Sequence, residues 1–300
     1  MLTFEVSRKP PHIAQERVRI FRLAPPRVSQ KAVLAHARRL GLKASTKIGT
    51  LCQDARQMVY SEGSFKVVVH RASGGVRFFD EARWQVDDGT SHVEFDDKTA
   101  IGMAERFIRA HSVVPLADCK VLRVTRLNVG IAEKATGFSE HRVVDVGVVF
   151  ARVVDGIPVE GPGGKAMVYI DAKGNLTGID CLWRDVGEVH GDHVALRSPD
   201  EVQKEAAREW DIEGSSRVTV DDFRFGYFEQ GWDVAQRYLQ PAYVLSMIVT
   251  ATEGEQAGRA IMGSGYLATA AVESPERLVP RHRAASPQGP RPRYAAGASS

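Results

Sequence analysis

The residues best suited to hold a metal ion lie in one short stretch, His190-Gly-Asp192-His193. Imidazole nitrogens and carboxylate oxygens are common ligands of divalent metals, and Glu188 lies just upstream. We expect this stretch to link a strand to the third helix, where polar side chains also occur simply because they are solvated. A structural zinc site would need further ligands from elsewhere in the chain. We therefore predict no metal site, with His190 and His193 as the candidates should one exist.

The three cysteines, Cys52, Cys119 and Cys181, are the candidate nucleophiles. A catalytic thiol needs a lowered pKa and a nearby base, and the sequence places no histidine beside any of them. Their odd number, wide spacing and lack of a CxxC pair argue against disulfides. We interpret them as small buried apolar residues in a reducing compartment, and we predict no catalytic residue.

The glycine-rich segment Gly161-Pro-Gly163-Gly164 is the candidate phosphate loop. Phosphate loops open a helix, whose N-terminus binds the anion. Here the segment lies between two predicted strands, so we interpret it as a tight connection. The sequence also has no Gly-x-Ser-x-Gly elbow, Walker A loop or dinucleotide-binding fingerprint. We predict no cofactor.

Aromatic side chains provide the candidate binding residues, which are Phe223, Phe225, Tyr227, Tyr238 and Tyr243. The first three occupy alternate positions of one predicted strand, and alternate residues share one face of a sheet. That face is either core, packed on the third helix through Trp210, or a concave binding surface. Core is the favoured interpretation, because a helix that covers a sheet buries the covered side.

Charge is unevenly distributed along the chain, whose net charge is +3. Residues 1–28 and residues 275–300 each carry +4, which leaves −5 for residues 29–274. A body that binds nucleic acid is expected to carry a basic face of its own. We therefore predict no specific nucleic-acid partner and interpret the basic ends as solvated, disordered segments.

Membrane and export signals are not found in the sequence. The start has no positively charged segment followed by an apolar one, as a secretory signal would have. The apolar stretch Val143–Val154 is broken by Asp145 and Arg152, so we predict no transmembrane segment. As written, the sequence is that of a cytoplasmic protein.

The elements that must position these residues follow a repeated order of helix and then strands. Helix N-caps are expected at Ser29, at Asp96-Asp97 and at Ser198, and apolar residues at helical spacing follow each of them. Alternating strand segments come next, with glycine turns such as Ser73-Gly74-Gly75. The predicted fold class is α+β, built from tandem units of one helix packed on a short antiparallel β-meander.

The expected boundaries follow these caps and the change in composition at both ends. They are 1–28 for a basic segment with an edge strand, 29–93 for the first unit, 94–190 for the second, 191–274 for the third, and 275–300 for a disordered basic tail.

The middle unit carries the motif Asp155-Gly-Ile-Pro-Val-Glu-Gly161, followed by a strand–turn–strand. It resembles PepSY-type modules and the propeptides of thermolysin-like and fungalysin proteases, and it is similar to sensor-kinase accessory regulators and to actinobacterial lipoproteins. The resemblance implies non-catalytic modules that inhibit a peptidase, assist its folding or contact a membrane partner, and it implies relatives that are usually exported. The residues that carry it have structural roles: Gly156, Pro158, Val159, Gly161, Asp171 and Gly174.

Three functional hypotheses remain open. The first is a non-catalytic binding or regulatory protein that contacts a protein or peptide partner, for example a peptidase inhibitor or regulator. The second is a cofactor-independent enzyme or binding protein that holds a small molecule in a cavity between sheet and helix. The third is a structural component of a larger assembly. An enclosed pocket favours the second hypothesis, and an open sheet face favours the first.

Overall fold

The structure is a computed structural model that describes residues 3–6, 13, 17–83, 92–133, 138–209, 215–251, 258–268 and 282–283. Within these ranges the chain forms three α-helices and one short 3-10 helix: α1 (Gln30–Arg39), α2 (Asp97–His111), α3 (Pro199–Glu209) and η1 (Leu116–Asp118). The strands are β1 (Thr3–Val6), β2 (Arg17–Leu23), β3 (Thr50–Gln53), β4 (Gln57–Glu62), β5 (Phe65–His70), β6 (Val76–Asp80), β7 (Cys119–Glu133), β8 (Phe138–Val154), β9 (Ile157–Glu160), β10 (Lys165–Asp171), β11 (Leu176–Leu182), β12 (Val186–Ala195), β13 (Ser215–Phe228), β14 (Tyr238–Ala251), β15 (Gly258–Leu267) and β16 (His282–Arg283).

The three helix starts that the sequence predicts are confirmed. The Ser29 hydroxyl accepts a hydrogen bond from the Ala32 amide at the start of α1, and the Asp96 carboxylate accepts one from the Thr99 amide at the start of α2. At α3, the Glu201 carboxylate accepts a hydrogen bond from the Ser198 amide. Each cap satisfies backbone donors that a helix start leaves without an intrahelical acceptor.

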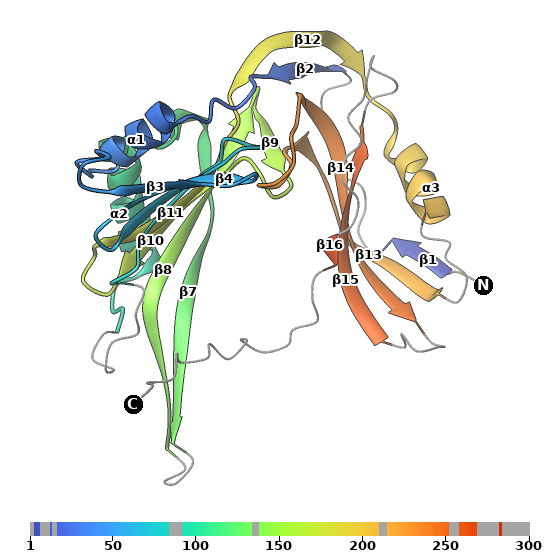
Figure 1. The fold of residues 1–300 in the computed structure, drawn as a ribbon. Helices are drawn as coiled ribbons and strands as arrows, with labels where there is room; N and C mark the ends of the chain where they lie inside the picture. Colours follow the sequence, from blue (N-terminus) through green and yellow to red (C-terminus); the bar gives the residue numbers. More distant parts are fainter. Residues whose placement is uncertain are drawn as a thin grey trace.

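A first section of the sheet contains the strands in the order β7-β8-β10-β11-β6-β5-β4-β3. Helices α1 and α2 both cover the same face of this section (Figure 1). The burial of β10 alternates residue by residue, as expected of a strand that has one face on a core. The resulting core joins residues from α1, α2 and six strands into one cluster, with Phe150, Tyr60 and Ile108 among its fully buried side chains.

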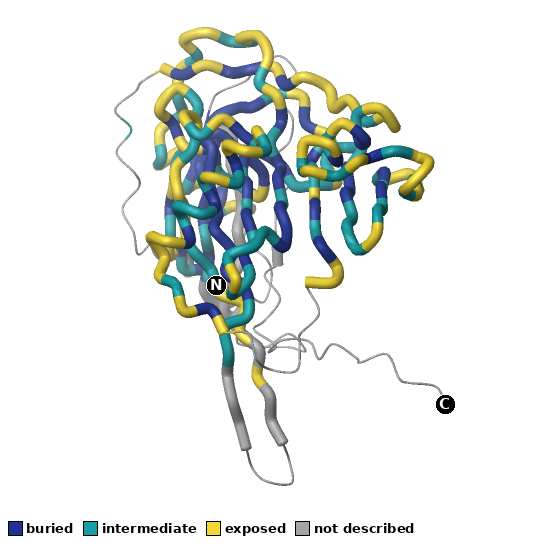
Figure 2. Tube along the Cα trace, turned by 90° about the vertical axis from the view of Figure 1, so that its left-hand side faces the viewer, coloured by how far each residue is buried: buried dark blue, intermediate teal, exposed yellow. Residues whose placement is uncertain are grey.

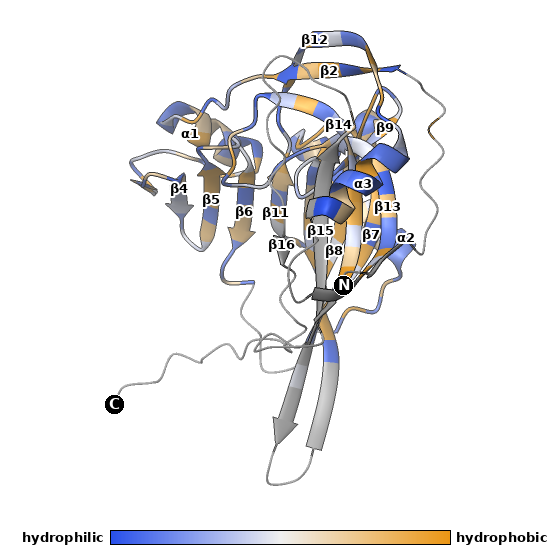
Figure 3. Ribbon diagram, turned by 90° about the vertical axis from the view of Figure 1, so that its right-hand side faces the viewer, coloured by the Kyte–Doolittle hydropathy of each residue, from blue (hydrophilic) through white to orange (hydrophobic). Residues whose placement is uncertain are grey.

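A second section contains β13, β14 and β15, with β1 parallel to β13 and β16 beside β15. Helix α3 packs on it through Val202 and Ala206, which join Val218, Val220 and Leu245 in a separate core. The rest of α3 is largely hydrophilic (Figure 3).

Strand β9 joins the two sections, so that the described strands form one mixed sheet. β9 pairs antiparallel with the end of β8 and parallel with β13. β2 pairs with β12 and with the start of β14, and these strands cross the top of the molecule (Figure 1). Buried segments run through the middle of the strands, whereas turns and much of the helix surface are exposed (Figure 2).

The expected fold class is therefore wrong, because the helices and strands do not form tandem units. Strand β6 of the first expected unit pairs with β11 of the second, and α1 and α2 share one core. An uncovered strand edge forms backbone hydrogen bonds with another edge when one is available. The sequence patterns identified the three helices and many of the strands, but they missed β12 and contained no information on which edges join.

Two further expectations change with this topology. The segment 186–195, interpreted as a linker, is strand β12. Strand β2, expected at an edge, lies between β12 and β14. Trp210 and most of the expected tail 275–300 lie outside the described residues.

Candidate functional site

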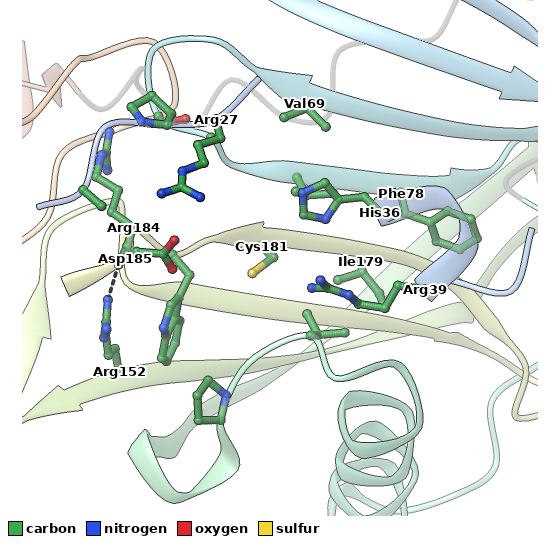
Figure 4. Close-up of a pocket in the computed structure, with 18 of the residues that line it drawn as sticks. Arg27, His36, Arg39, Val69, Phe78, Arg152, Ile179, Cys181, Arg184 and Asp185 are labelled. Atoms are coloured by element: carbon green, nitrogen blue, oxygen red, sulfur yellow. Dashed lines mark hydrogen bonds between the residues drawn. The ribbon is translucent and has the colours of Figure 1, made fainter. Parts of the chain in front are cut away.

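A cavity of about 610 Å³ lies between α1, the segment that follows α2, and the sheet in the first section. Its walls come from the linker before α1, the last turn of α1, and the segment between α2 and η1. Its floor comes from β6, β11 and the connection that follows β11 (Figure 4). The volume lies within the range of pockets that enclose small organic molecules.

The floor of the cavity is mainly apolar. Residues of β6 and β11 that face the helices alternate with residues that face away, which places apolar side chains in one row. Those that line the cavity are Val76, Phe78, Ile179, Cys181 and Trp183. An apolar surface of this kind favours the body of an organic molecule over a hydrated inorganic ion.

The walls of the cavity carry more positive than negative charge. Arg27 and Arg39 extend into it from opposite sides, with Cys181 between them (Figure 4). Neither guanidinium makes a hydrogen bond or ion pair with any residue that the structure describes. Asp185 is the single carboxylate among the lining residues. Guanidinium groups bind carboxylates, sulfonates and phosphates through charge-assisted hydrogen bonds.

Arg152 of β8 supplies a third positive charge, and it is only 8% exposed. Its Nη1 donates to the Arg184 carbonyl oxygen at 2.6 Å, and its guanidinium lies over the Trp183 ring at 4.8 Å. Its Nε has no hydrogen-bond partner among the described residues. Burial lowers the pKa of Arg152, while Glu229 acts in the opposite direction. Arg152 therefore places a buried donor beside the cavity.

Arg184 joins the cavity to the loop between β13 and β14. Its Nη1 donates to the Gln230 carbonyl oxygen at 2.8 Å, and its Nη2 donates to those of Gly231 and Val234 at 2.9 and 2.6 Å. The Glu229 carboxylate lies 3.3 Å from Nη1 and is fully buried. Burial raises the pKa of Glu229, and Arg184 opposes that effect. The Arg184 guanidinium is thus bound by groups of the protein itself, whereas those of Arg27 and Arg39 are not bound by any residue that the structure describes.

The glycine-rich segment packs on the same loop and has a structural role. The Gly163 amide donates to the Glu229 carbonyl oxygen at 2.9 Å. A Cβ atom on Gly163 would lie 2.6 Å from the Gln230 carbonyl oxygen, so only glycine allows this close approach. The prediction of a tight connection between strands is confirmed.

His36 and Cys181 are the other ionisable groups at the cavity. Burial lowers the pKa of His36, and the neighbouring Arg39 lowers it further. His36 is therefore mainly neutral at pH 7. Burial raises the pKa of the Cys181 thiol to about 12, which keeps it protonated and weakly nucleophilic. Cys181 is buried in the floor, as the sequence predicts, whereas Cys52, for which burial was also predicted, is exposed.

The aromatic residues proposed from the sequence do not line this cavity. Phe223, Tyr227 and Tyr243 are buried, and the Tyr227 and Tyr243 hydroxyls donate to the carbonyl oxygens of Arg19 and Arg197. Phe225 is half-buried against the same rings, and Tyr238 packs on His190. The rings of Phe223, Phe225 and Tyr243 lie in the core beneath α3. The Tyr227 ring lies in an adjoining core, which Phe225 also contacts.

The histidines considered as metal ligands are separated by the pleat of β12. His190 packs on the Tyr238 ring at 4.6 Å between centroids. His193 is exposed, with Nε2 3.6 Å from an Asp192 oxygen. Over the described ranges, no three His, Cys, Asp or Glu side chains come together as metal ligands would.

The motif residues of the middle unit shape turns and a strand. Gly156, Gly161 and Gly174 all have positive φ, which glycine adopts without strain. Pro158 and Val159 belong to β9, where Val159 is buried. The Asp171 carboxylate accepts hydrogen bonds from the amides of Lys173 and Asn175 in the β10–β11 turn. These are local roles that many strand–turn–strand segments share.

The residues that define the cavity were not among the predicted site residues. Arg39 lies in the last turn of α1, where a cation is favourable without any ligand. Arg27 belongs to the basic segment 1–28, which was interpreted as solvated. Arg152 gave the one usable signal, because an arginine inside an apolar strand must be buried with a partner or beside a ligand.

Comparison with known proteins supports the fold and not a family. No protein-family model matches the chain, and no curated protein resembles it in sequence. A crystal structure of an uncharacterized protein from Eubacterium rectale ATCC 33656 superposes with a TM-score of 0.51 at 10% identity, covering 88% of this chain and 86% of that chain. The chain shares that fold.

The resemblance to PepSY and protease-propeptide modules is therefore wrong. The motif that suggested it marks the β8–β9 turn and strand β9, which connects the two sections of a large sheet. The matching structure extends over nearly the whole chain and not over one repeated unit.

None of the helices in the described part of the chain combines the length and the apolar character that crossing a membrane requires.

Proposed function

We propose that this protein binds a small organic anion in the cavity between α1, the segment after α2 and the sheet. The observation that carries the proposal is the pairing of an apolar floor with Arg27 and Arg39, whose guanidinium groups point into the cavity without partners among the described residues. The apolar body of such a ligand covers the floor, and its anionic group binds the arginines.

The buried Arg152 adds to this preference for anions, and Glu229, 4.0 Å from its Nη1, offsets part of its charge. A buried cation disfavours a second cation nearby, and its attraction for an anion is screened less than that of a surface group. Because His36 is neutral at pH 7, it contributes ring surface and a hydrogen bond instead of a fixed charge. The cavity therefore selects a ligand by one negative group and an apolar or aromatic body.

The experiment compares two fluorescent probes that share their rings and differ in charge. Anilinonaphthalene sulfonate carries a sulfonate, and phenylnaphthylamine is neutral. We expect the protein to bind the sulfonate probe more tightly. Arg27→Gln and Arg39→Gln are each expected to weaken sulfonate binding by about fivefold, since an exposed ion pair contributes up to ~1 kcal/mol.

The matched control is Arg208→Gln, which removes an exposed arginine of α3 far from the cavity. Binding of the sulfonate probe should not change in this variant. Equal affinity for the two probes, or equal sulfonate affinity in all variants, contradicts the proposal.

A further inference from the structure

Strand β7 forms one end of the first section. Among the described strands it pairs with β8 alone, and the β7–β8 hairpin extends away from the rest of the sheet (Figures 1 and 2). Backbone N–H and C=O groups on the free side of such a strand point away from its partner and can pair with another extended chain. No residue of β7 lines the cavity.

Apolar side chains are unusually exposed on this strand. Five large apolar side chains are exposed in the described part of the chain, and three of them lie on β7: Val121, Leu122 and Leu127. Their exposed fractions are 40%, 52% and 47%. An edge strand that carries apolar residues is a surface to which other chains bind, unless charges prevent it.

The charges on β7 are all positive up to Asn128, and they come from Lys120, Arg123 and Arg126. Arg126 forms an ion pair with Asp97 at the start of α2. Lys120 and Arg123 are exposed and have no ion-pair partner among the described residues. The strand thus combines a free backbone edge, exposed apolar side chains and uncompensated cations.

We propose that the free edge of β7 binds an extended acidic segment of another protein by strand addition. The segment hydrogen-bonds to the backbone of β7, places carboxylates opposite Lys120 and Arg123 on one face, and covers Val121 on the other face with apolar side chains. Cross-strand pairs of opposite charge stabilise such an arrangement, whereas like charges oppose it.

Charge argues against two other occupants of this edge. Antiparallel pairing of two copies centred on Arg123 places residue 120 opposite residue 126, so that a cation faces a cation at all three positions. The chain's own residues 275–300 contain five arginines and one glutamate, so they also repel the edge. An acidic partner is the occupant that the charges of β7 select.

The test measures fluorescence anisotropy of a labelled heptapeptide in which glutamate and valine alternate. A heptapeptide of alternating lysine and valine is the charge control. We expect the acidic peptide to bind the full-length protein and the basic peptide not to bind. Arg123→Glu should weaken binding at least tenfold, and Val121→Ser about threefold to fivefold.

The matched controls are Arg208→Glu on α3 and Val189→Ser on β12, which change the same residue types at other exposed sites. Hydrogen exchange shows where the peptide binds: amides of residues 119–127 should exchange more slowly in its presence. Slowed exchange at the cavity instead, unchanged affinity in Arg123→Glu, or concentration-dependent protection of β7 without peptide, which assigns the edge to a second copy, overturns the proposal.

Discussion

Asp145 is a carboxylate on β8 that is only 9% exposed. It accepts hydrogen bonds from the Ile170 amide at 3.2 Å and the Thr177 hydroxyl at 2.6 Å. Burial nevertheless raises its pKa to about 6, and Asp171 adds to that effect. A charge inside the apolar stretch 143–154 therefore has a measurable effect on stability.

Asp145→Asn should change how stability depends on pH. Because its pKa is raised in the folded chain, Asp145 contributes stability that is fully present below about pH 4 and is lost as pH rises through 6. The shift of ~2 units corresponds to about 2–3 kcal/mol. Asparagine is uncharged, its Oδ1 can accept from the Ile170 amide, and its Nδ2 can donate to the Thr177 hydroxyl. Between pH 4 and pH 7 the wild type should therefore lose that much relative to the variant. Urea unfolding at both pH values measures this, and parallel pH profiles contradict it.

At the residue scale, local chemistry was the most predictable part of the molecule. Ser29, Asp96 and Ser198 were identified as caps because a short polar side chain beside an apolar periodic run satisfies free amides. The cavity arginines were missed although Arg27 and Arg39 are only 12 residues apart, because neither interrupts a pattern. Their proximity depends on how α1 packs on the sheet.

Turns and helices were also predictable at the element scale. Asp155-Gly156 connects β8 to β9, and both residues have positive φ, as a two-residue hairpin requires. The turn at residues 73–75, which connects β5 to β6, was predicted for the same reason, and Gly74 has positive φ there. The pairing of β6 with β11 or of β9 with β13 could not be predicted, because alternating patterns show which face is buried but not which edge is adjacent.

The same substitution should have opposite effects in two elements. Gly156→Ala adds a Cβ with no atom within 4 Å but at a φ of +76°, so it should destabilise the protein by about 1 kcal/mol. Gly102→Ala lies inside α2, where the nearest atom is 3.9 Å away, and it should stabilise by about 0.5–1 kcal/mol. Urea unfolding of both variants measures the two changes, and effects of the same sign contradict this assignment of backbone conformation.

The whole molecule depends on contacts between distant segments. Arg184 binds the loop that connects β13 to β14, and β9 pairs with both sections of the sheet. These long-range pairings explain why the expectation of separate units was wrong even though its three helices were right. The shared fold with the Eubacterium rectale protein extends over most of both chains.

The cavity is the feature of the whole molecule with the most direct functional consequence, because it forms only where α1, the segment after α2, the linker after β2 and strands β6 and β11 meet. A crystal structure of the protein with anilinonaphthalene sulfonate tests the proposed function most directly. We expect the sulfonate to lie within hydrogen-bond distance of the Arg27 or Arg39 guanidinium, and the naphthalene ring to pack on Ile179 and Cys181. A probe bound elsewhere, with the cavity left empty, contradicts it.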